Sequence, residues 1–459
     1  MSKHLFSNLN LPKELTDNLE TLGYKEMTEI QAKSLPVLLE GKDVTAQAKT
    51  GSGKTAAFGI SLVYSLDPDS KDPSSLVLCP TRELADQVAT ELKRLARFSH
   101  NIKIITLCGG TPIMPQVRSL EHGANIIVGT PGRVKDHIER ANFKLKTIKS
   151  YVLDEADRML DMGFKDDIEF ITKRLPQKRQ TMLFSATYPP EIDTIAKDYL
   201  VNPKMIVAET VHEEHKIKQI FIDTEDQKKY HVLLNALSEY GIDNAMVFCR
   251  TKKQCDELSE KLNKEGYFSE AIHGDLEQKD RNEVLAMFSN GSLHLLVSTD
   301  VAARGIDIKS LGAVVNYDIS KDPSVHVHKI GRTGRADEEG LALTLYSEKE
   351  LHMVTAIEDH LNIFVDKVSA KDLKPHQKPD EPKMATLLIG AGKKAKLRPG
   401  DILGAITKDG KFEGSQVGNI KIFPWHSYVA VERRLAGKIL NHLKNNKIKG
   451  KNIKPHLLD

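Results

Sequence analysis

The sequence contains few cysteines and no long apolar segment. Its four cysteines are Cys79, Cys108, Cys249 and Cys255, and none forms a Cys-x-x-Cys pair. This spacing disfavours a disulfide framework and a zinc site, and it predicts buried free thiols in a reducing compartment. No apolar run approaches the ~18 residues that a membrane span requires, and the N-terminal residues lack the apolar core of a signal peptide. We therefore expect a cytoplasmic protein that does not engage a membrane.

The composition is otherwise that of an ordinary globular protein. Hydrophobic residues make up 40% of the 459 residues, enough to bury conventional cores, and this length predicts about three domains. No internal repeat of solenoid length is present. His326 and His328 lie close together, but no cysteine or carboxylate cluster accompanies them, so the sequence predicts no metal site there.

A glycine-rich string at residues 46–55 reads Ala-Gln-Ala-Lys-Thr-Gly-Ser-Gly-Lys-Thr. In a phosphate-binding loop, backbone N–H groups turn onto the phosphates, a lysine reaches the β/γ oxygens, and a threonine hydroxyl ligates Mg²⁺. The string departs from the general pattern at Ala48, where glycine is usual. A flexible Gly/Ser linker is the alternative, but apolar flanks favour a strand–loop–helix. The expected nucleotide-binding residues are Ala48, Lys49, Thr50, Gly51, Ser52, Gly53, Lys54 and Thr55.

An acidic string, Asp154-Glu155-Ala156-Asp157, follows the apolar residues 150–153. The apolar run predicts a strand, and ligands of parallel α/β sheets lie at the carboxyl ends of strands. There Asp154 can enter the Mg²⁺ shell together with Thr55, and Glu155 can polarise the attacking water. Acidic residues also begin helices for electrostatic reasons alone. The phosphate loop upstream favours the catalytic interpretation.

The ordered motifs of residues 1 to about 368 resemble those of DEAD-box RNA-dependent ATPases. The resemblance implies that ATP and Mg²⁺ are the cofactors, that Phe6 and Gln31 contact adenine, and that Asp307 contacts the ribose. It implies that Lys54, Asp154, Glu155, Arg332 and Arg335 are catalytic, and that Ser185, Thr187 and His328 couple hydrolysis to domain closure. The RNA contacts that it implies are Pro80, Thr81, Arg82, Gly110, Thr130, Pro131, Gly132, Arg133, Arg250 and Thr299.

Three positions depart from the family pattern. Met27 and Glu29 stand where prolines are frequent, and we expect this to affect loop stiffness more than adenine recognition. Lys329 replaces a common arginine, which keeps the charge but removes the planar fork that makes bidentate contacts.

Apolar runs alternate with amphipathic stretches across residues 40–345, a pattern typical of parallel α/β units. Strands are expected at residues 76–79, 102–107, 126–128, 151–153, 181–184, 245–248, 293–297 and 313–315. Residues 202–216 are expected to connect the two halves. Residues 374–383 contain three prolines and predict a stiff, extended spacer.

The predicted fold class is α/β, with two tandem RecA-like parallel-sheet domains and a small α+β domain that resembles an RNA-recognition motif. The predicted boundaries are residues 1–208 and 209–368 for the two RecA-like domains, 369–383 for a linker, and 384–459 for the last domain. This last segment carries fifteen basic and five acidic residues, a net charge of +10, whereas the remainder is −7. A solvated charged surface is one explanation, but the foldable pattern of the segment favours RNA binding.

The C-terminal segment predicts a β-α-β-β-α-β order. Strands are expected at residues 385–389, 417–423, 428–432 and 448–453, and helices at 398–406 and 433–443. The stacking aromatics of an RNA-recognition motif are mostly missing, since Tyr428 is the single ring on its face of the third strand. Trp425 is equally compatible with base stacking and with core burial. We expect RNA contacts from loops and basic edges, through Lys393, Lys394, Lys396, Arg398, Arg433, Arg434 and Lys438.

This segment resembles the C-terminal domain of bacterial DbpA-type helicases, which implies recognition of a hairpin in large-subunit ribosomal RNA and a role in ribosome assembly. The charge and fold pattern alone predict only structured RNA as partner, and no obligate protein partner is expected. A DNA-translocating helicase is disfavoured by the acidic string, the glutamine segment and the basic tail. A non-catalytic RNA scaffold is disfavoured by the intact Lys54, Glu155, Arg332 and Arg335.

Overall fold

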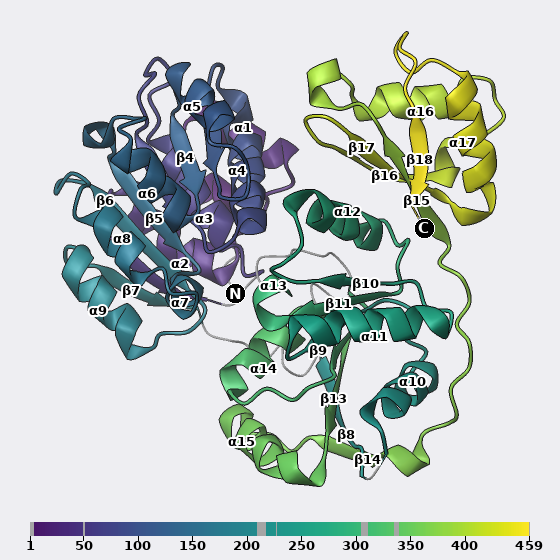
Figure 1. Cartoon of the computed structure of the whole chain (residues 1–459). Coiled ribbons are helices and arrows are strands. Elements are labelled where there is room, and N and C mark those ends of the chain that lie inside the picture. The colour runs from purple at the N-terminus through teal and green to yellow at the C-terminus, as the bar shows by residue number, and fades with distance from the viewer. Residues whose placement is uncertain are drawn as a thin grey trace. The chain divides into compact units, whose positions relative to one another are not determined.

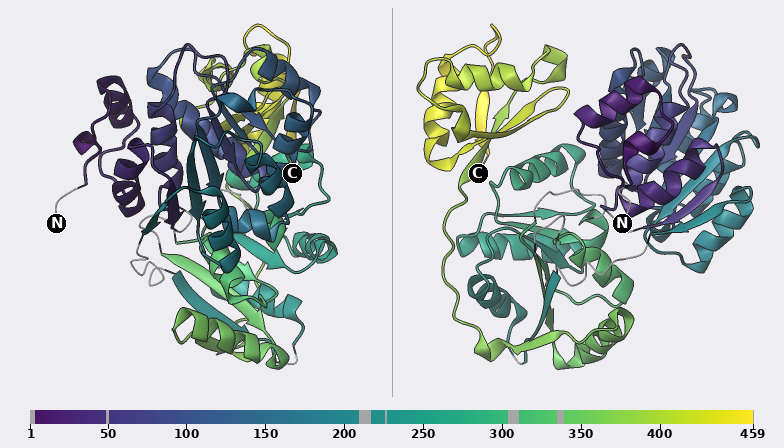
Figure 2. Two further views of the ribbon diagram at one scale, coloured as in Figure 1. Left: turned by 90° about the vertical axis from the view of Figure 1, so that its left-hand side faces the viewer. Right: turned by 180° about the vertical axis from the view of Figure 1, so that it is seen from behind.

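The computed structural model of the chain describes residues 4–48, 51–208, 217–225, 227–303, 311–334 and 339–458. It contains three β-sheets and divides into two compact units, the first built around one sheet and the second around the other two (Figures 1 and 2). Two seven-stranded parallel sheets and one four-stranded antiparallel sheet confirm the predicted fold class.

The first sheet has the strand order β3-β4-β2-β5-β6-β1-β7. Its strands are β1 (Val44–Gln47), β2 (Ser75–Leu78), β3 (Ile104–Leu107), β4 (Ile126–Gly129), β5 (Ser150–Asp154), β6 (Gln180–Ser185) and β7 (Lys204–Val207). The helices are α1 (Lys13–Thr21), α2 (Glu29–Leu39), α3 (Lys54–Tyr64), α4 (Arg82–Leu95), α5 (Met114–Glu121), α6 (Pro131–Glu139), α7 (Ala156–Asp161), α8 (Lys165–Thr172) and α9 (Pro190–Tyr199). Both faces of the sheet are buried: Val77 and Val152 join one apolar cluster, whereas Tyr151 and Leu153 join the other.

The second sheet has the order β10-β11-β9-β12-β13-β8-β14. Its strands are β8 (Ile217–Asp223), β9 (Ala245–Cys249), β10 (Ser269–Ile272), β11 (Leu295–Thr299), β12 (Ala313–Asn316), β13 (Gly340–Tyr346) and β14 (Asp366–Ser369). The helices are α10 (Lys229–Glu239), α11 (Lys252–Lys264), α12 (Gln278–Ser289), α13 (Asp300–Ala303), α14 (Pro323–Ile330) and α15 (Leu351–Leu361). Ala370 and Leu373 pack in the core of this domain, inside the segment predicted as a linker, and His376 stacks on Tyr267 with ring centroids 5.8 Å apart.

All eight strands expected in the two RecA-like domains are present, within a few residues of their expected ends. The expectation that residues 202–216 merely connect the halves is wrong at its start, because Lys204–Val207 form the edge strand β7 beside β1. Only Ile206 of that strand is buried, so no apolar periodicity marks it.

The third sheet has the order β16-β17-β15-β18 and is antiparallel. Its domain contains β15 (Met384–Ile389), α16 (Pro399–Thr407), β16 (Val417–Ile422), β17 (Ser427–Glu432), α17 (Ala436–Asn445) and β18 (Pro455–Leu458). The predicted β-α-β-β-α-β order is therefore confirmed, but the last strand is not at residues 448–453. Ile448 and Ile453 are buried in the core from a turn and a loop, which explains why their apolar pattern was misleading.

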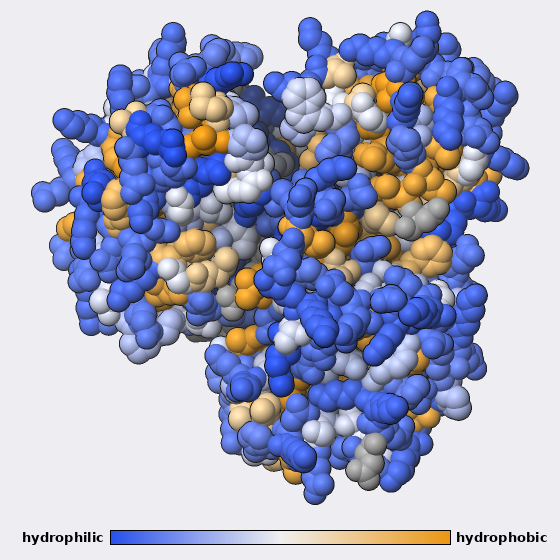
Figure 3. All heavy atoms as spheres, in the orientation of Figure 1, coloured by the Kyte–Doolittle hydropathy of each residue, from blue (hydrophilic) through white to orange (hydrophobic). Residues whose placement is uncertain are grey.

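The face of the molecule in Figure 3 is mostly hydrophilic, with apolar residues scattered over it. Among the described residues, no helix is long and apolar enough to cross a membrane. All four cysteines are buried free thiols, as the sequence predicts.

Candidate nucleotide and RNA sites

The glycine-rich string forms a loop between β1 and α3. Gly53 precedes the helix with a φ of 93°, in the left-handed region, and a Cβ there would lie 2.4 Å from Gln31 Nε2. Lys54, the first residue of α3, is buried and donates from Nζ to the Ala48 carbonyl over 2.7 Å. The N–H of Ala48 donates to the Ser185 carbonyl over 2.9 Å. The departure from glycine at Ala48 is thus accommodated, because its backbone pairs with the neighbouring strand.

The predicted adenine-contacting segment is tied to this loop through Gln31. Its Oε1 accepts from the Thr28 N–H over 2.9 Å, and its Nε2 donates to the Gly53 carbonyl over 3.1 Å. Thr28 and Gln31 form a capping box at the start of α2, which orients the amide. Phe6 is buried against Tyr24, with the two rings edge to face at 5.6 Å. The structure therefore places Gln31 beside the loop and Phe6 in the adjoining core.

The acidic string leaves the carboxyl end of β5, as expected. Asp154 is buried at the last position of the strand, and burial, together with the nearby charge of Glu155, raises its pKa to about 7 although Lys54 opposes this shift. Glu155 has a φ of 54° and precedes α7. Its Oε2 lies 3.3 Å from Nη1 of the buried Arg158. Two buried carboxyl groups, those of Asp154 and Glu155, therefore lie at the carboxyl end of β5, where the sequence predicts a cation and the attacking water.

A Mg²⁺ ion fits the chemistry of this donor set. The charged form of Asp154 is destabilised by burial, so a cation beside it would restore its ordinary acidity. Thr55 lies on α3 one residue after Lys54 and is half-buried. Mg²⁺ is typically held by one or two protein oxygens together with substrate phosphates and water. Thr55 and Asp154 are the protein oxygens that the sequence predicts for this role. No three His, Cys, Asp or Glu side chains group as metal ligands anywhere in the described parts of the chain.

Asp157, to which the sequence assigned no role, joins the acidic string to the predicted coupling residues. Its Oδ2 accepts from the N–H and the Oγ1 of Thr187, over 2.9 and 2.8 Å. The N–H of Asp157 donates to Ser185 Oγ over 3.3 Å. Hydrogen bonds to a carboxylate are stronger than those between neutral groups. A shift in the position of Asp157 would therefore act directly on Ser185 and Thr187 through these hydrogen bonds.

The predicted RNA residues of the first domain lie at the starts of α4 and α6 and in the turn after β3. Thr81 caps α4 by accepting from the Leu84 N–H over 3.3 Å, and it follows the buried Pro80. Gly110 allows the guanidinium of Arg82 to approach its backbone, because a Cβ there would lie 2.4 Å from Arg82 Nη1. Thr130, Pro131 and Gly132 begin α6.

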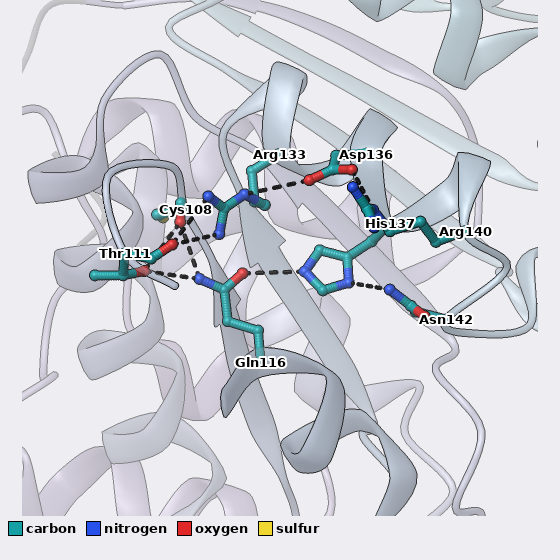
Figure 4. A network of polar contacts seen from close by, with 8 residues as sticks. All are labelled: Cys108, Thr111, Gln116, Arg133, Asp136, His137, Arg140 and Asn142. Atoms are coloured by element: carbon teal, nitrogen blue, oxygen red, sulfur yellow. Dashed lines mark hydrogen bonds and ion pairs between the residues drawn. The ribbon is translucent and has the colours of Figure 1, made fainter. Parts of the chain in front are cut away.

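A chain of hydrogen bonds holds the turn after β3 and Arg133 in place (Figure 4). Arg133 donates from Nη1 and Nη2 to the Thr111 carbonyl over 3.1 and 3.0 Å. Gln116 donates from Nε2 to the Cys108 carbonyl over 2.9 Å and to Thr111 Oγ1 over 3.0 Å. The buried His137 contacts the other end of the Gln116 amide at 3.0 Å. No motif in the sequence marks Gln116 or His137.

The second domain carries the remaining predicted site residues of the helicase part. Arg250 is exposed, and its N–H donates to Asp318 Oδ2 over 2.9 Å, whereas Thr299 ends β11. Lys329, which replaces the usual arginine, is buried and forms an ion pair of 2.7 Å with Asp300. Arg332 is buried just after α14, and His328 lies within that helix. Lys49, Thr50, Asp307 and Arg335 lie outside the described residues.

His326 is explained by packing. It is fully buried, its Nε2 lies 3.0 Å from Gln219 Oε1, and burial lowers its pKa to about 3. A neutral histidine satisfied by an amide agrees with the expectation that this position is not a metal ligand.

The basic candidates of the C-terminal domain divide into two groups. The side chains of the first group are exposed; they are Lys393, Lys394, Lys396, Arg398, Arg434 and Lys438. Arg433 is instead half-buried, lies 4.2 Å from the ring centroid of Phe268, and donates to the Pro382 carbonyl over 2.9 Å and to the Ser292 carbonyl over 3.3 Å. Arg433 thus has structural partners that its position in the sequence did not indicate.

Comparison with known proteins agrees with this arrangement. The DEAD/DEAH box helicase family matches residues 28–195, the helicase conserved C-terminal domain matches residues 228–337, and the DbpA RNA binding domain matches residues 386–456. ATP-dependent RNA helicase DbpA of Escherichia coli (strain K12) is 48% identical over 455 residues, covering 99% of both chains. DEAD-box ATP-dependent RNA helicase CshA of Bacillus subtilis (strain 168) is 42% identical over 369 residues, covering 80% of this chain and 74% of that protein.

Solved structures resemble the helicase part of the chain. S. cerevisiae Dbp5 bound to RNA and ADP BeF3 aligns with a TM-score of 0.73 and 32% identity, covering 81% of this chain and 97% of that one. Mss116p bound to ssRNA and AMP-PNP aligns with a TM-score of 0.71 and 27% identity, covering 80% of each chain. The chain therefore belongs to the DEAD-box family of ATP-dependent RNA helicases, and it carries a DbpA-type RNA-binding domain after its two helicase domains.

Proposed function

We propose that this helicase separates local structure in large-subunit ribosomal RNA during ribosome assembly, and that its C-terminal domain selects the RNA. The observation that carries the proposal is the charge separation between the parts of the chain. Residues 384–459 have a net charge of +10, whereas residues 1–383 have a net charge of −7. The match of residues 386–456 to the DbpA RNA binding domain, and of the whole chain to E. coli DbpA, supports a shared type of target.

For hydrolysis, we propose that Lys54 neutralises the phosphates and that Glu155 orients and deprotonates the attacking water. Thr55 and Asp154 would hold Mg²⁺, which supplies positive charge to the phosphate oxygens when bound. Gln31 is already oriented by Thr28 and Gly53, so its remaining hydrogen-bonding positions can recognise adenine. Phe6, buried beside Tyr24, would then hold the adenine-contacting segment in position by packing.

Arg332 and Arg335 are the proposed arginine fingers of the second domain, and Asp307 its proposed ribose contact. Such arginines typically contribute ~10³–10⁵ in rate, so hydrolysis should be slow until RNA brings the two domains together. The similar structures of Dbp5 and Mss116p each hold RNA together with a nucleotide analogue, which supports a joint site for both ligands in this chain. Asp157 would transmit the state of the nucleotide to Ser185 and Thr187 through its hydrogen bonds.

We propose that the helicase domains contact the phosphates and 2′-hydroxyls of RNA. The proposed residues of the first domain are threonines and prolines at helix starts, glycines and arginines, which suit a sugar–phosphate backbone and read no base. The helicase domains would therefore act on RNA of any sequence. Selection would come from the C-terminal domain, and the cytoplasm, where ribosomal RNA is assembled in bacteria, is the proposed location.

ATPase measurements with different nucleic acids test this proposal. The full chain is titrated with large-subunit ribosomal RNA, with an unrelated RNA of the same length, and with single-stranded DNA. We expect half-maximal stimulation at the lowest concentration for ribosomal RNA, a much higher concentration for the unrelated RNA, and little stimulation by DNA. Equal stimulation by both RNAs would contradict the proposed target, and equal stimulation by DNA would favour a DNA helicase.

A further inference from the structure

Trp425 is the single tryptophan of the chain and has 71% of its surface exposed. It lies in the turn between β16 and β17 of the C-terminal domain. Tryptophan is a large ring that folded proteins usually bury to a high degree, and its exposure here leaves most of the indole accessible to a ligand. The structure thus decides between the two roles that the sequence left open for this residue, and core burial is excluded.

The backbone under this ring is fixed by a second turn. The N–H groups of Lys393 and Lys394 donate to the carbonyls of Phe423 and Pro424, each over 2.9 Å. The Phe423 N–H donates to the His426 carbonyl, also over 2.9 Å. Gly392 permits this approach, because a Cβ there would lie 2.1 Å from the Phe423 carbonyl oxygen. Backbone hydrogen bonds therefore join the turns at residues 392–396 and 423–426 into one support.

Cations surround the aromatic side chains on this support. Lys394 Nζ lies 5.6 Å from the centroid of the Trp425 ring, and Lys421 Nζ lies 5.5 Å from that of Phe423. Lys393 and Lys396 are exposed in the same pair of turns. We refer to Trp425, Lys393, Lys394 and Lys396 as the Trp425 platform. An exposed ring with flanking ammonium groups suits a polyanion that also presents flat, apolar bases.

The two central strands of this domain's sheet, β15 and β17, offer no comparable surface. Tyr428, the one ring on its face of β17, is fully buried. On the same face of the neighbouring β15, Thr386 is buried and its Oγ1 lies 2.6 Å from Ser292 Oγ. The exposed ring on this face is the imidazole of His456 on the edge strand β18, opposite Leu388, whereas the central strands β15 and β17 present no exposed ring for the base stacking that is usual in an RNA-recognition motif.

We infer that the Trp425 platform binds an unpaired RNA base by stacking it on the indole, while Lys393, Lys394 and Lys396 hold the adjoining phosphates. This inference rests on the proposed RNA selection by the C-terminal domain and specifies where that selection occurs. The domain's net charge of +10 favours RNA over an acidic or neutral apolar partner, because a ribosomal RNA supplies phosphates along the whole path of approach.

Tryptophan fluorescence tests the site without labelling, because all of the signal comes from Trp425. The full chain, without nucleotide, is titrated with an RNA hairpin that has an adenosine loop, and with a blunt duplex of the same stem. We expect the looped hairpin to quench the emission strongly and the blunt duplex to leave most of it. An emission unchanged by saturating looped hairpin, with binding verified by sedimentation, would overturn the inference.

Affinity measurements with variants give an independent test. Trp425→Ala should weaken binding of the looped hairpin by about 5- to 150-fold, the equivalent of the ~1–3 kcal/mol that one stacked base contributes. Trp425→Phe should restore most of this loss. Lys394→Met should weaken binding and lower the slope of log affinity against log salt by ~0.7. As control, Phe364→Ala removes another aromatic side chain, 99% exposed, and should change neither quantity.

The outcomes separate this inference from the proposed function. If Trp425→Ala binds the hairpin as wild type does, while the full chain still prefers ribosomal RNA, the platform is wrong and the proposed function stands. If Trp425→Ala instead loses binding of a ribosomal protein and keeps its RNA affinity, the surface serves a protein partner and the inference is also wrong. If loss of hairpin affinity accompanies loss of the ribosomal RNA preference, both are supported.

Discussion

His137 and Gln116 are joined by a hydrogen bond of 3.0 Å between Nε2 and Oε1. Asn142 determines its direction: its Nδ2 donates to His137 Nδ1 over 2.9 Å, so the proton of the neutral ring must be on Nε2. Gln116 then accepts from His137, and its own amide N–H groups point to Cys108 and Thr111. This network of side-chain hydrogen bonds thus ends at the Cys108 carbonyl and the Thr111 hydroxyl, in the turn that also receives Arg133.

Replacing Gln116 with methionine tests whether this chain positions the RNA-binding turn. The variant keeps the side-chain length but loses both donors, each worth ~0.5–1.5 kcal/mol. We expect the RNA concentration for half-maximal ATPase stimulation to rise about 2- to 10-fold, with little change in kcat at saturating RNA or in the KM for ATP. Glu121→Met, an exposed change in the same helix, serves as control. A loss of kcat with an unchanged RNA requirement would contradict the positioning role.

The protonation of His137 predicts a pH dependence of stability. Burial, assisted by the nearby charge of Arg133, lowers its pKa to about 4. In the unfolded chain the group titrates near 6.5, so its stabilising effect is complete above that pH and is lost as the pH falls toward 4. The stability advantage of wild type over His137→Gln should therefore shrink by about 2 kcal/mol between pH 7.5 and pH 5. Thermal melting of both proteins across this range measures it, and a constant difference would refute a neutral His137.

The contact between Asp157 and Thr187 predicts a coupling defect. Asp157→Ala removes both hydrogen bonds to Thr187, whereas Thr187→Ala removes the one that its hydroxyl donates and keeps the one from its backbone N–H. Both variants lose the hydroxyl–carboxylate bond, so we expect each to lower the unwinding achieved per ATP hydrolysed. Their effects should not add in the double variant, because the shared interaction can be lost only once. Thr194→Ala, which removes an exposed hydroxyl that donates to the Pro190 carbonyl of its own helix, is the control. Additive effects would mean that the two residues act separately.

Glu155→Gln tests the assignment of the general base. The amide keeps the shape of the side chain and its reach to Arg158 but cannot accept the proton of water. We expect near-normal ATP binding, a turnover lowered by ~10²-fold or more, and slow release of RNA while ATP is bound. Glu169→Gln, a surface change that breaks only an exposed ion pair with Lys173, should leave turnover unchanged. Retention of most activity in Glu155→Gln would exclude it as the base.

The sequence predicts the elements whose signal is local and continuous. The phosphate loop and the acidic string each adjoin an apolar strand, and the structure places them together because β1, β5 and β6 are neighbours in one parallel sheet. The fully buried strand Ile126–Gly129 was also expected, at residues 126–128, since these residues are all apolar. The edge strand Lys204–Val207 lacks this signal. The last strand, Pro455–Leu458, was predicted too early in the sequence because the apolar residues Ile448 and Ile453 precede it.

Long-range side-chain contacts leave no such trace in the sequence. His137 lies 21 residues from Gln116 on a different helix, and neither belongs to a glycine-rich or charged string. Arg433 was grouped with the exposed RNA candidates on charge alone, but its position over Phe268 depends on how β17 lies beside a distant segment. Trp425 was ambiguous because exposure of a turn residue is decided by the neighbouring turn at residues 392–396.

Deleting residues 384–459 tests the central claim most directly, namely that selection of RNA and hydrolysis of ATP reside in different parts of the chain. The two helicase family matches cover residues 28–195 and 228–337 and end before this segment, so the remaining chain should fold and hydrolyse ATP. We predict that the truncated protein is stimulated by any RNA at high concentration and no longer prefers large-subunit ribosomal RNA over an unrelated RNA. A truncated protein that keeps the full preference at low RNA concentration would contradict the account.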